Sequence, residues 1–338
     1  MNAPLTPTTM RAVIQREYGG PDTLSLSTTQ PIPEPGPGEV RVRVHASSVA
    51  AGDVHMMTGR PYLIRLFGYG VLAPKYGRPG LDVSGVVDAV GEGVTRFKKG
   101  DEVYGELERG AFADYVVGSQ DLLARMPKGL TFEQAGAIPT SGMTALAAVK
   151  EHGQVTAGDR VLVIGATGGV GHFALQIAVA EGAEVHAVSS ERNAPLAREL
   201  GAAHAFDYRK EDFSSTVAAY DVVIDTAGRL PLGTARRMLR PGGRWVAVSA
   251  GNLGDWLGPI PRMLTAAMGN LGKSAKIISF ITMPGAEKLE ELARRVEQGT
   301  LRPVLQETYD LEQAPRALAD QASGGARGKR VISVRSAA

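Results

Sequence analysis

A short apolar strand that runs through a glycine-rich turn into an apolar helix constrains the fold of this chain most strongly. The strand Val161–Ile164 passes directly into seven turn residues and then into the helical pattern of residues 171–181. Glycine in such a turn avoids side chains that would block the helix packing and the approach of a pyrophosphate to the backbone. The amides at the helix start can then bind phosphates. The predicted cofactor-binding residues are Gly165, Ala166, Thr167, Gly168, Gly169, Val170 and Gly171.

The residues around this loop repeat the same alternation of apolar run and helix. Taken alone, a glycine triplet also occurs in strand-to-helix turns that bind nothing. Runs that are apolar throughout are typical of strands buried on both faces of a parallel sheet, and repeated strand–helix units predict a doubly wound Rossmann domain, here residues 131–284. The predicted strands are Arg160–Ile164, Glu184–Val188, Val222–Ile224, Arg244–Val248 and Lys276–Ile281, with helices that include residues 171–181 and 194–200.

The first 130 residues are predicted to form a mainly β domain. Val40–Val44 alternates apolar and charged residues after a proline-rich turn, and further short strands are separated by glycine-rich turns such as Gly91–Gly93. After Pro284, two helical patterns and a final strand at Arg330–Val334 follow. We expect this tail to fold back onto the first domain, which would then comprise residues 1–130 with 285–338.

The composition excludes several classes of function. The 338 residues include 37 basic and 35 acidic side chains, a net charge of +2 that leaves no surplus to neutralise the phosphates of a nucleic acid. The absence of cysteine excludes disulfides, thiolate chemistry and cysteine-ligated zinc. No stretch approaches the roughly 18 apolar residues of a membrane span, and the first residues lack a signal-peptide pattern. We therefore predict no membrane partner and a cytoplasmic location.

The residues after the second Rossmann strand indicate which dinucleotide binds. NAD enzymes place an acid about 20 residues past the loop, where it holds the ribose 2′-hydroxyl. Here Ser190 can donate to a 2′-phosphate, Arg192 can neutralise it, and Tyr208 after the next strand can close the same pocket. Glu191 argues the other way, and Arg192 has the alternative role of a solvated residue at a helix start. The pattern as a whole predicts NADPH.

Six motifs occur in an order that is specific to a known family. They are Pro33–Val40, Gly80–Gly91, Lys99–Gly105, Gly110–Val116, Thr144–Leu146 and the glycine loop. Their order resembles the medium-chain dehydrogenase/reductase superfamily, and within it the zinc-independent quinone oxidoreductase-like branch that includes zeta-crystallin-type enzymes. The resemblance implies an α/β fold in which an N-terminal GroES-like, mainly β catalytic domain accompanies the Rossmann domain.

The resemblance also bears on metal binding. Zinc members of the superfamily carry a ligand set that typically includes cysteine and a His-Glu pair. This chain has Leu81 and Asp82 where that pair would stand, and His55 is the only histidine near the expected cleft. The resemblance therefore implies that no metal is bound.

Without a metal, the nicotinamide must be held against an electron-poor carbon while donors or water stabilise the developing oxyanion. The resemblance points to the strand end at Asp53, although Ala50 stands where many relatives have asparagine. The candidate catalytic residues are Asp53, Thr144 and Tyr62, the last as a proton donor in a cover loop. Thr144 and Lys329 are also predicted to face the cofactor.

Three of these candidates have structural alternatives that the sequence leaves open. Asp53 can cap the following helix, and Thr144 can stabilise a helix start. Lys329 can be a solvated lysine in a turn.

We expect an NADPH-dependent, zinc-independent oxidoreductase that passes hydride to quinones or α,β-unsaturated carbonyl compounds in a cleft between the domains. Enoyl reduction of acyl thioesters is one alternative. The missing polar side chain at Ala50 motivates another, a non-catalytic NADPH-binding protein with a structural or sensor role. The resemblance further implies a homodimer formed through the edge strand Lys276–Ile281.

Overall fold

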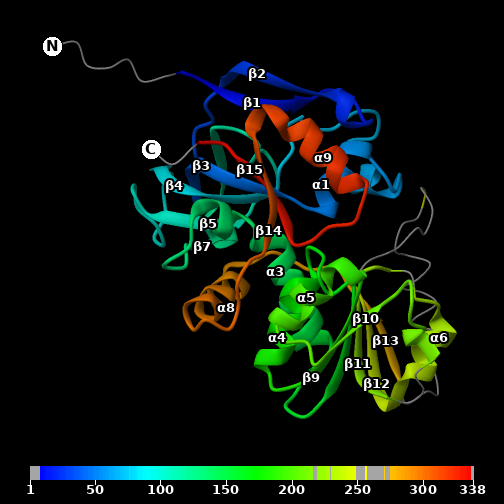
Figure 1. Ribbon diagram of the computed structural model, residues 1–338. Helices are drawn as coiled ribbons and strands as arrows, with labels where there is room; N and C mark the ends of the chain where they lie inside the picture. Colours follow the sequence, from blue (N-terminus) through cyan, green and yellow to red (C-terminus); the bar gives the residue numbers. More distant parts are fainter. Residues whose placement is uncertain are drawn as a thin grey trace.

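Two β-sheets, one in each half of the molecule, organise the chain in the computed structural model (Figure 1). The structure describes residues 8–75, 77–215, 219–228, 230–248, 256, 270 and 275–335. The upper sheet in Figure 1 contains strands from the N-terminal part and from the C-terminal end of the chain, and the lower sheet contains strands from the middle of the sequence. This arrangement of a mainly β half and a helix-covered parallel sheet confirms the predicted α/β fold class.

All six strands of the lower sheet run parallel, in the order β10-β9-β8-β11-β12-β13. The winding reverses beside β8, and ligands of such sheets bind outside the carboxyl ends of the strands at this switch point. Strand β8 begins and ends at the residues that the apolar run predicts. The strands are β8 (Arg160–Ile164), β9 (Glu184–Ser189), β10 (His204–Asp207), β11 (Tyr220–Asp225), β12 (Leu239–Ala247) and β13 (Lys276–Ser279).

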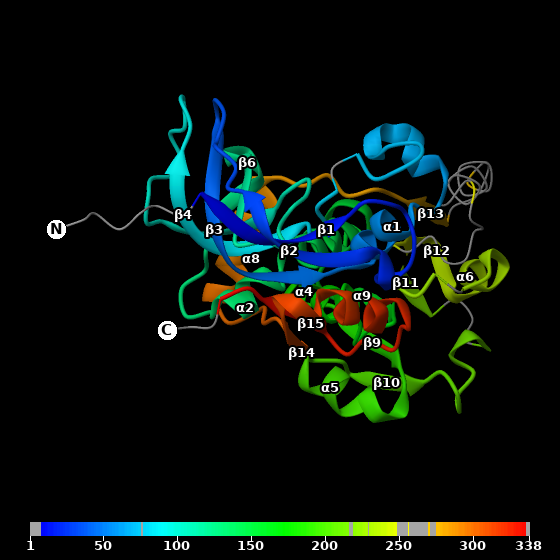
Figure 2. The same cartoon turned by 90° about the horizontal axis from the view of Figure 1, so that it is seen from above.

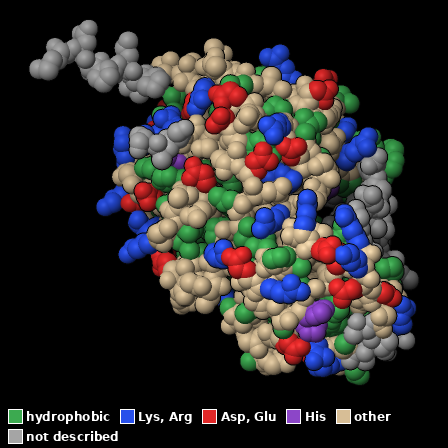
Figure 3. Space-filling view, viewed as in Figure 1, with side chains coloured by type: hydrophobic (Ala, Val, Ile, Leu, Met, Phe, Trp, Pro, Cys, Tyr) green, Lys and Arg blue, Asp and Glu red, His purple; other side chains and the backbone are tan. Residues whose placement is uncertain are grey.

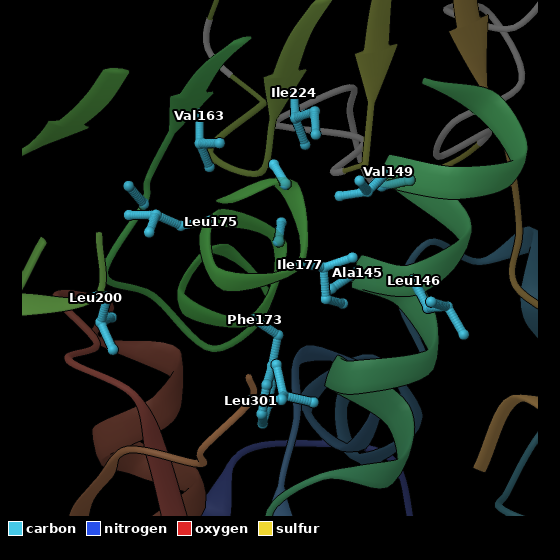
Figure 4. Packing of buried hydrophobic residues seen from close by; sticks show 14 of the residues in the cluster. Ala145, Leu146, Val149, Val163, Phe173, Leu175, Ile177, Leu200, Ile224 and Leu301 are labelled. Carbon is cyan, nitrogen blue, oxygen red and sulfur yellow. The ribbon is translucent and has the colours of Figure 1, made fainter. Parts of the chain in front are cut away.

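Helices cover both faces of the lower sheet, because its strands are apolar on both faces. Leu175 and Ile177 of α4 pack against Val163 of β8, and Val149 approaches the same buried cluster from the end of the α3 helix (Figure 4). A second cluster around Trp245 packs against α6 on the other face. The helices of this half are α3 (Pro139–Leu146), α4 (Gly171–Ala180), α5 (Ala194–Glu199) and α6 (Leu232–Met238).

The upper sheet is mixed, in the order β14-β15-β3-β4-β5-β7, with β6 paired to β3. Strand β15 pairs antiparallel with β3 and parallel with β14, so the end of the chain completes this sheet. Strands β1 and β2 form a separate hairpin over it (Figure 2). The strands are β1 (Thr9–Gln15), β2 (Leu24–Pro31), β3 (Glu39–Val49), β4 (Asp82–Val90), β5 (Glu102–Glu106), β6 (Tyr115–Ser119), β7 (Leu123–Arg125), β14 (Leu305–Asp310) and β15 (Lys329–Ser333).

One of the remaining helices connects the two halves, and the others pack within the upper half. Helix α8 contacts both α3 and β7, while α9 contacts α1 and β15. The chain also makes π-helical turns at Arg65–Tyr69 and Ala147–His152. These helices are α1 (Ala51–Thr58), α2 (Phe132–Gly136), α8 (Ala286–Glu297) and α9 (Ala314–Ala322).

Most predicted elements agree with the structure to within a few residues, and the exceptions have a physical reason. The sequence pattern does not predict β14, because four of its six side chains are exposed and no apolar alternation marks it. Strand β12 begins five residues earlier than predicted. Pro241 and the two glycines after it give the first part of this strand the sequence pattern of a turn.

The surface carries charges of both signs. Lysine and arginine side chains are interspersed with aspartate and glutamate on the face shown in Figure 3. Among the helices of the described residues, none combines the length and the hydropathy that a membrane crossing requires.

Candidate functional site

The glycine loop at the end of β8 has steric reasons for its glycines. Gly165 has φ +77°, and a Cβ there would lie 2.6 Å from the Thr226 hydroxyl oxygen. A Cβ at Gly171 would lie 2.0 Å from the carbonyl oxygen of Gly165, which no side chain can tolerate. At Gly169 the nearest atoms to a Cβ would be 3.7 Å away, so this glycine leaves room beside the backbone. The tight turn therefore ends where α4 begins, as dinucleotide binding requires.

The loop lies between the two halves of the molecule. The carbonyl of Thr167 accepts a hydrogen bond of 2.8 Å from the amide of Gly328, which precedes β15. The amides of Gly165 and Ala166 both donate to the carbonyl of Val188 at the end of β9. The predicted phosphate loop is thus held by both sheets.

The residues predicted to bind a 2′-phosphate lie together at the carboxyl ends of β9 and β10. The Tyr208 amide donates to the carbonyl of Ser189 over 3.2 Å, which brings Tyr208 beside Ser190. The Arg192 guanidinium is exposed and donates to the carbonyl of Gly325 over 3.3 Å. This end of the site is open to solvent, and Tyr208 is itself exposed.

Glu191, which argued against NADPH, has a cationic partner. The ammonium of Lys210 lies 2.7 Å from the Glu191 carboxylate, and this hydrogen bond raises the pKa of Lys210. Lys210 follows β10 by three residues, and nothing in the local sequence pairs it with Glu191. The ammonium of Lys210 therefore offsets the negative charge of Glu191, which would otherwise repel a 2′-phosphate.

A buried carboxylate, Asp82, stands at the start of β4 and is surrounded by donors. Its Oδ1 accepts hydrogen bonds from the Thr140 amide (2.9 Å) and hydroxyl (2.6 Å), and its Oδ2 accepts one of 2.5 Å from the Ser48 hydroxyl. The Lys329 ammonium lies 3.5 Å from the same Oδ2. Residues of three other elements, β3, α3 and β15, thus hold the Asp82 carboxyl group in place.

Lys329 links Asp82 to the glycine loop. Its side chain is almost fully buried and donates a 2.9 Å hydrogen bond to the Ser141 hydroxyl. A Cβ at Gly169 would be 3.7 Å from both the Lys329 Cδ and the Ser141 Oγ. The alternative of a solvated turn lysine is therefore wrong, and the lysine faces the predicted cofactor loop.

Two more carboxyl groups, Asp53 and Glu106, lie near this pair. Asp53 is fully buried, and its Oδ2 accepts a 2.8 Å hydrogen bond from the Ala50 amide. Burial raises the pKa of Asp53 to about 7. Burial and the neighbouring negative charge of Asp82 raise the pKa of Glu106 to about 8. Both groups therefore hold protons near neutral pH.

The structure shows the contacts that the three catalytic candidates, Asp53, Thr144 and Tyr62, make within the chain. Asp53 does cap α1 through the Ala50 amide, while its Oδ1 has no hydrogen-bond partner among the described residues. The Thr144 hydroxyl donates to the Thr140 carbonyl (2.7 Å) one turn earlier in α3. The Tyr62 ring contacts Trp256, with ring centroids 5.1 Å apart. These contacts give Thr144 a role within its helix and place Tyr62 in an aromatic pair.

The structure also shows which side chains are grouped closely enough to bind a metal ion and where the surface is hollowed. Within the described parts of the chain, no group of three or more His, Asp or Glu side chains is arranged to hold a metal ion. The Nδ1 of His55 lies 3.0 Å from the Arg60 carbonyl. Two surface hollows of about 400 and 380 Å³ are lined by residues that include Arg11 and Arg16, and neither reaches the glycine loop.

Five functional candidates do not follow from the sequence patterns: Asp82, Glu106, Thr140, Ser141 and Lys210. Asp82 and Glu106 stand at a strand start and a strand end beside apolar or glycine residues. Burial of an unpaired carboxylate is costly, so an acidic residue at either end of an apolar strand needs partners elsewhere in the fold. That position is the one sequence signal that marks Asp82 and Glu106.

Comparison with known proteins gives the same family throughout. The family model of the alcohol dehydrogenase GroES-like domain matches residues 36–128, and that described as zinc-binding dehydrogenase matches residues 200–332. The quinone oxidoreductase of Sus scrofa is 32% identical over 335 residues, which cover 96% of this chain and 97% of that protein. The quinone oxidoreductase structure from Coxiella burnetii has a TM-score of 0.84 at 28% identity, and covers 97% of this chain and 100% of that one. The CurK enoyl reductase structure has a TM-score of 0.82 at 25% identity, with 96% and 99% covered.

Proposed function

The chain belongs to the medium-chain dehydrogenase/reductase superfamily and to its quinone oxidoreductase-like branch, and from this membership we propose that it transfers hydride from NADPH to quinones or α,β-unsaturated carbonyl compounds. An oxidoreductase with a nicotinamide cofactor is what the family relationship establishes. We propose in addition that the cofactor is NADPH, that the acceptors are quinones or α,β-unsaturated carbonyl compounds, and that the reaction does not use zinc.

The observation that carries the proposal is the contact between the glycine loop and the buried lysine. Gly165 and Gly171 form a cradle that a Cβ would fill, so the loop fits a dinucleotide. Lys329 places a positive charge beside Gly169 in a site from which water is largely excluded. Such an arrangement favours the anionic part of a dinucleotide.

The choice of NADPH is supported at the ribose end. Arg192 and Tyr208 are exposed there beside the half-buried Ser190, and Lys210 offsets the one acid that would favour NADH. An arginine and a hydroxyl can together bind the doubly charged 2′-phosphate.

The residues present do not fit catalytic zinc. The chain has no cysteine, and Leu81 offers no ligand atom at the position where zinc members have histidine. The match to a family model described as zinc-binding dehydrogenase therefore reflects common ancestry of the fold. We propose that hydride transfer proceeds without a metal, and stoichiometric zinc in a metal assay of the purified protein would contradict this.

When bound, NADPH supplies the hydride, and the chain supplies position and charge. The amides at the start of α4 would hold the phosphates of the bound dinucleotide, and Arg192 would hold its 2′-phosphate. Lys329 neutralises charge beside the loop, while Asp53 and Glu106 hold protons at the buried end of the site.

The test is turnover with a panel of quinones, enals, enones and enoyl thioesters, followed by the loss of NADPH absorbance, with binding of NADPH measured separately by calorimetry. Turnover of quinones or enones is the expected result. Preference for thioesters would favour enoyl reduction, which the similarity to the CurK enoyl reductase makes the second candidate. Binding without any turnover would favour a non-catalytic role, in line with Ala50.

Four further properties are part of the proposal. We place the catalytic domain at residues 1–130 with 285–338 and the cofactor domain at 131–284. We propose a homodimer through β13, the last strand in the order of the lower sheet, which light scattering would test. We also propose a cytoplasmic location, with a small molecule and no nucleic acid as the substrate.

A further inference from the structure

The buried ring of His172, the second residue of α4, has a hydrogen-bond partner at each nitrogen. Its Nδ1 lies 2.8 Å from the carbonyl oxygen of Gly168 in the glycine loop, and its Nε2 lies 3.3 Å from the amide nitrogen of Val304, which precedes β14. A carbonyl only accepts and an amide only donates, so the hydrogen of the ring must be on Nδ1. Burial lowers the pKa of His172 to about 4, and the cations that face it, Lys329 on β15 and Arg302 before β14, act in the same direction. His172 is therefore a neutral ring between the glycine loop and the segment before β14.

The Gly168 carbonyl orients the peptide bond that it shares with Gly169. It accepts hydrogen bonds from the ring of His172 over 2.8 Å and from the backbone amide of the same residue over 3.1 Å. The carbonyl and the next amide of a planar trans peptide point in opposite directions, so the Gly169 amide points away from the ring. Among the described residues, no backbone carbonyl accepts a hydrogen bond from this amide. It is therefore available to a phosphate at the start of α4.

The other side of the ring is connected to Lys329. The carbonyl of Val304 accepts a 2.8 Å hydrogen bond from the Lys329 amide, and a Cβ at Gly328 would lie 2.1 Å from the same carbonyl oxygen. Hydrogen bonds thus run from the glycine loop through His172 and Val304 to the backbone of the lysine that faces the loop. The hydrogen bond from Gly328 to Thr167 is a second link between these segments.

Gln176, one turn further along α4, holds the segment before β14 but not the loop. Its side-chain nitrogen donates to the carbonyl of Arg302 over 3.0 Å, and its oxygen accepts from the amide of Arg302 over 2.9 Å. Leu301, one residue earlier, belongs to the same buried cluster as Phe173 of α4 (Figure 4). The attachment of this segment to α4 therefore has contributions besides His172, and Gln176 offers a matched control.

We propose that His172 is a positioning residue for the dinucleotide: its neutral ring orients the Gly169 amide for the phosphates and holds the glycine loop in place against Lys329. This role rests on the proposed function, which puts the dinucleotide phosphates at this loop. The pyrophosphate is common to NADPH and NADH. His172 should therefore affect the binding of both dinucleotides alike, unlike Arg192 at the ribose end.

The experiment is calorimetric binding of NADPH and NADH to the full chain, to His172→Ala and to Gln176→Ala, with chemical denaturation of each. Both substitutions leave backbone groups of the segment before β14 without a partner, so both should lower the free energy of unfolding. Only His172→Ala should also weaken binding, roughly tenfold for each dinucleotide, because a hydrogen bond that orients the loop is lost. Gln176→Ala should bind both dinucleotides as the unmodified chain does.

Nitrogen NMR of the His172 ring provides a readout that a purely structural role would not move. The ring should carry its hydrogen on Nδ1, and the signals of Nε2 and of the Val304 amide should shift when NADPH binds. A hydrogen on Nε2, or signals that NADPH does not move, would contradict the positioning role. This measurement uses the unmodified chain and decides even if His172→Ala does not fold.

Each binding outcome has a separate meaning. Unchanged binding in His172→Ala, or equal weakening in Gln176→Ala, would overturn the positioning role and leave the proposed function intact. A loss confined to NADPH would also overturn it, because His172 would then act at the ribose end. Failure of the unmodified chain to bind either dinucleotide would overturn the proposed function and the positioning role together.

Discussion

The charged groups at the two ends of the candidate cofactor site differ in how far they are exposed to water. At the ribose end, Lys210 and Glu191 are 62% and 70% exposed, and their partners are neighbours in sequence or on the next strand. At the buried end, Lys329 and Asp82 are at most 1% exposed, and the contacts come from four separate elements, β3, β4, α3 and β15. Water screens the first set of charges and is excluded from the second. Single changes should therefore have small, salt-dependent effects at the ribose end and large, pH-dependent effects at the buried end.

The largest effect is expected for Gly171→Ala, in the loop that joins the two ends. The added Cβ would lie 2.0 Å from the Gly165 carbonyl oxygen, so the turn cannot keep its shape. We expect a loss of about 4 kcal/mol or more in the free energy of unfolding, and loss of NADPH binding. Chemical denaturation and calorimetry would measure the two effects.

Gly169→Ala is the matched control for this loop. Its nearest contacts would be 3.7 Å away, so stability should change by less than about 1 kcal/mol. Equal destabilisation by both substitutions would show that glycine is needed here for a reason other than the close approach at Gly171.

The next largest effect is expected at Asp53, as a pH dependence of stability. Its pKa is about 7 in the folded chain against 3.8 ordinarily, so the folded state holds the proton more tightly than the unfolded state. The unmodified chain therefore loses stability as the pH rises from about 4 to about 7, and the loss is complete above that range. Asp53→Asn can still accept the Ala50 hydrogen bond and has no such loss.

We accordingly expect Asp53→Asn to gain on the order of 4 kcal/mol relative to the unmodified chain between pH 4 and pH 8, since the pKa differs by about three units and one unit corresponds to about 1.4 kcal/mol. Denaturant unfolding at several pH values would measure the difference. The exposed Asp121→Asn is the control and should show no such trend. A constant difference between Asp53→Asn and the unmodified chain would mean that Asp53 is ionised throughout.

The same contrast explains what the sequence could predict. The glycine loop and the ribose end lie within short stretches of chain, so strand pattern, glycine spacing and local charge are sufficient to predict Gly165, Ser190 and Arg192. The buried network is non-local, because Asp82, Thr140 and Lys329 are brought together by strand order and by the return of the chain end to β3. No pattern within a short stretch carries that information. The fold class was predictable for the same reason that the loop was, since its periodicities are local.

At the ribose end, Arg192→Ala should weaken NADPH binding roughly tenfold, or about 1.5 kcal/mol, because one charge-assisted contact to the 2′-phosphate is lost. NADH binding should change much less, since NADH lacks that phosphate. The difference between the two dinucleotides should shrink as salt is added, because Arg192 is exposed. Equal losses for NADPH and NADH would place Arg192 away from the phosphate.

The smallest effect is expected for Lys210→Ala. Without Lys210, the Glu191 carboxylate is no longer neutralised and repels the 2′-phosphate. An exposed ion pair contributes less than about 1 kcal/mol, so NADPH binding should weaken two- to threefold, while NADH binding is unchanged or slightly tighter because Glu191 can accept from a ribose hydroxyl. Calorimetry at low salt would measure both dinucleotides.

The double variant Lys210→Ala with Glu191→Gln separates two explanations of that small loss. If Lys210 acts by neutralising Glu191, removing both charges restores NADPH binding nearly to that of the unmodified chain. If Lys210 binds the phosphate itself, the double variant stays as weak as Lys210→Ala. Arg316→Ala, which removes an exposed ion pair beside β14, is the control and should leave binding unchanged. Restoration would show that the ribose end selects its cofactor by offsetting the charge of Glu191.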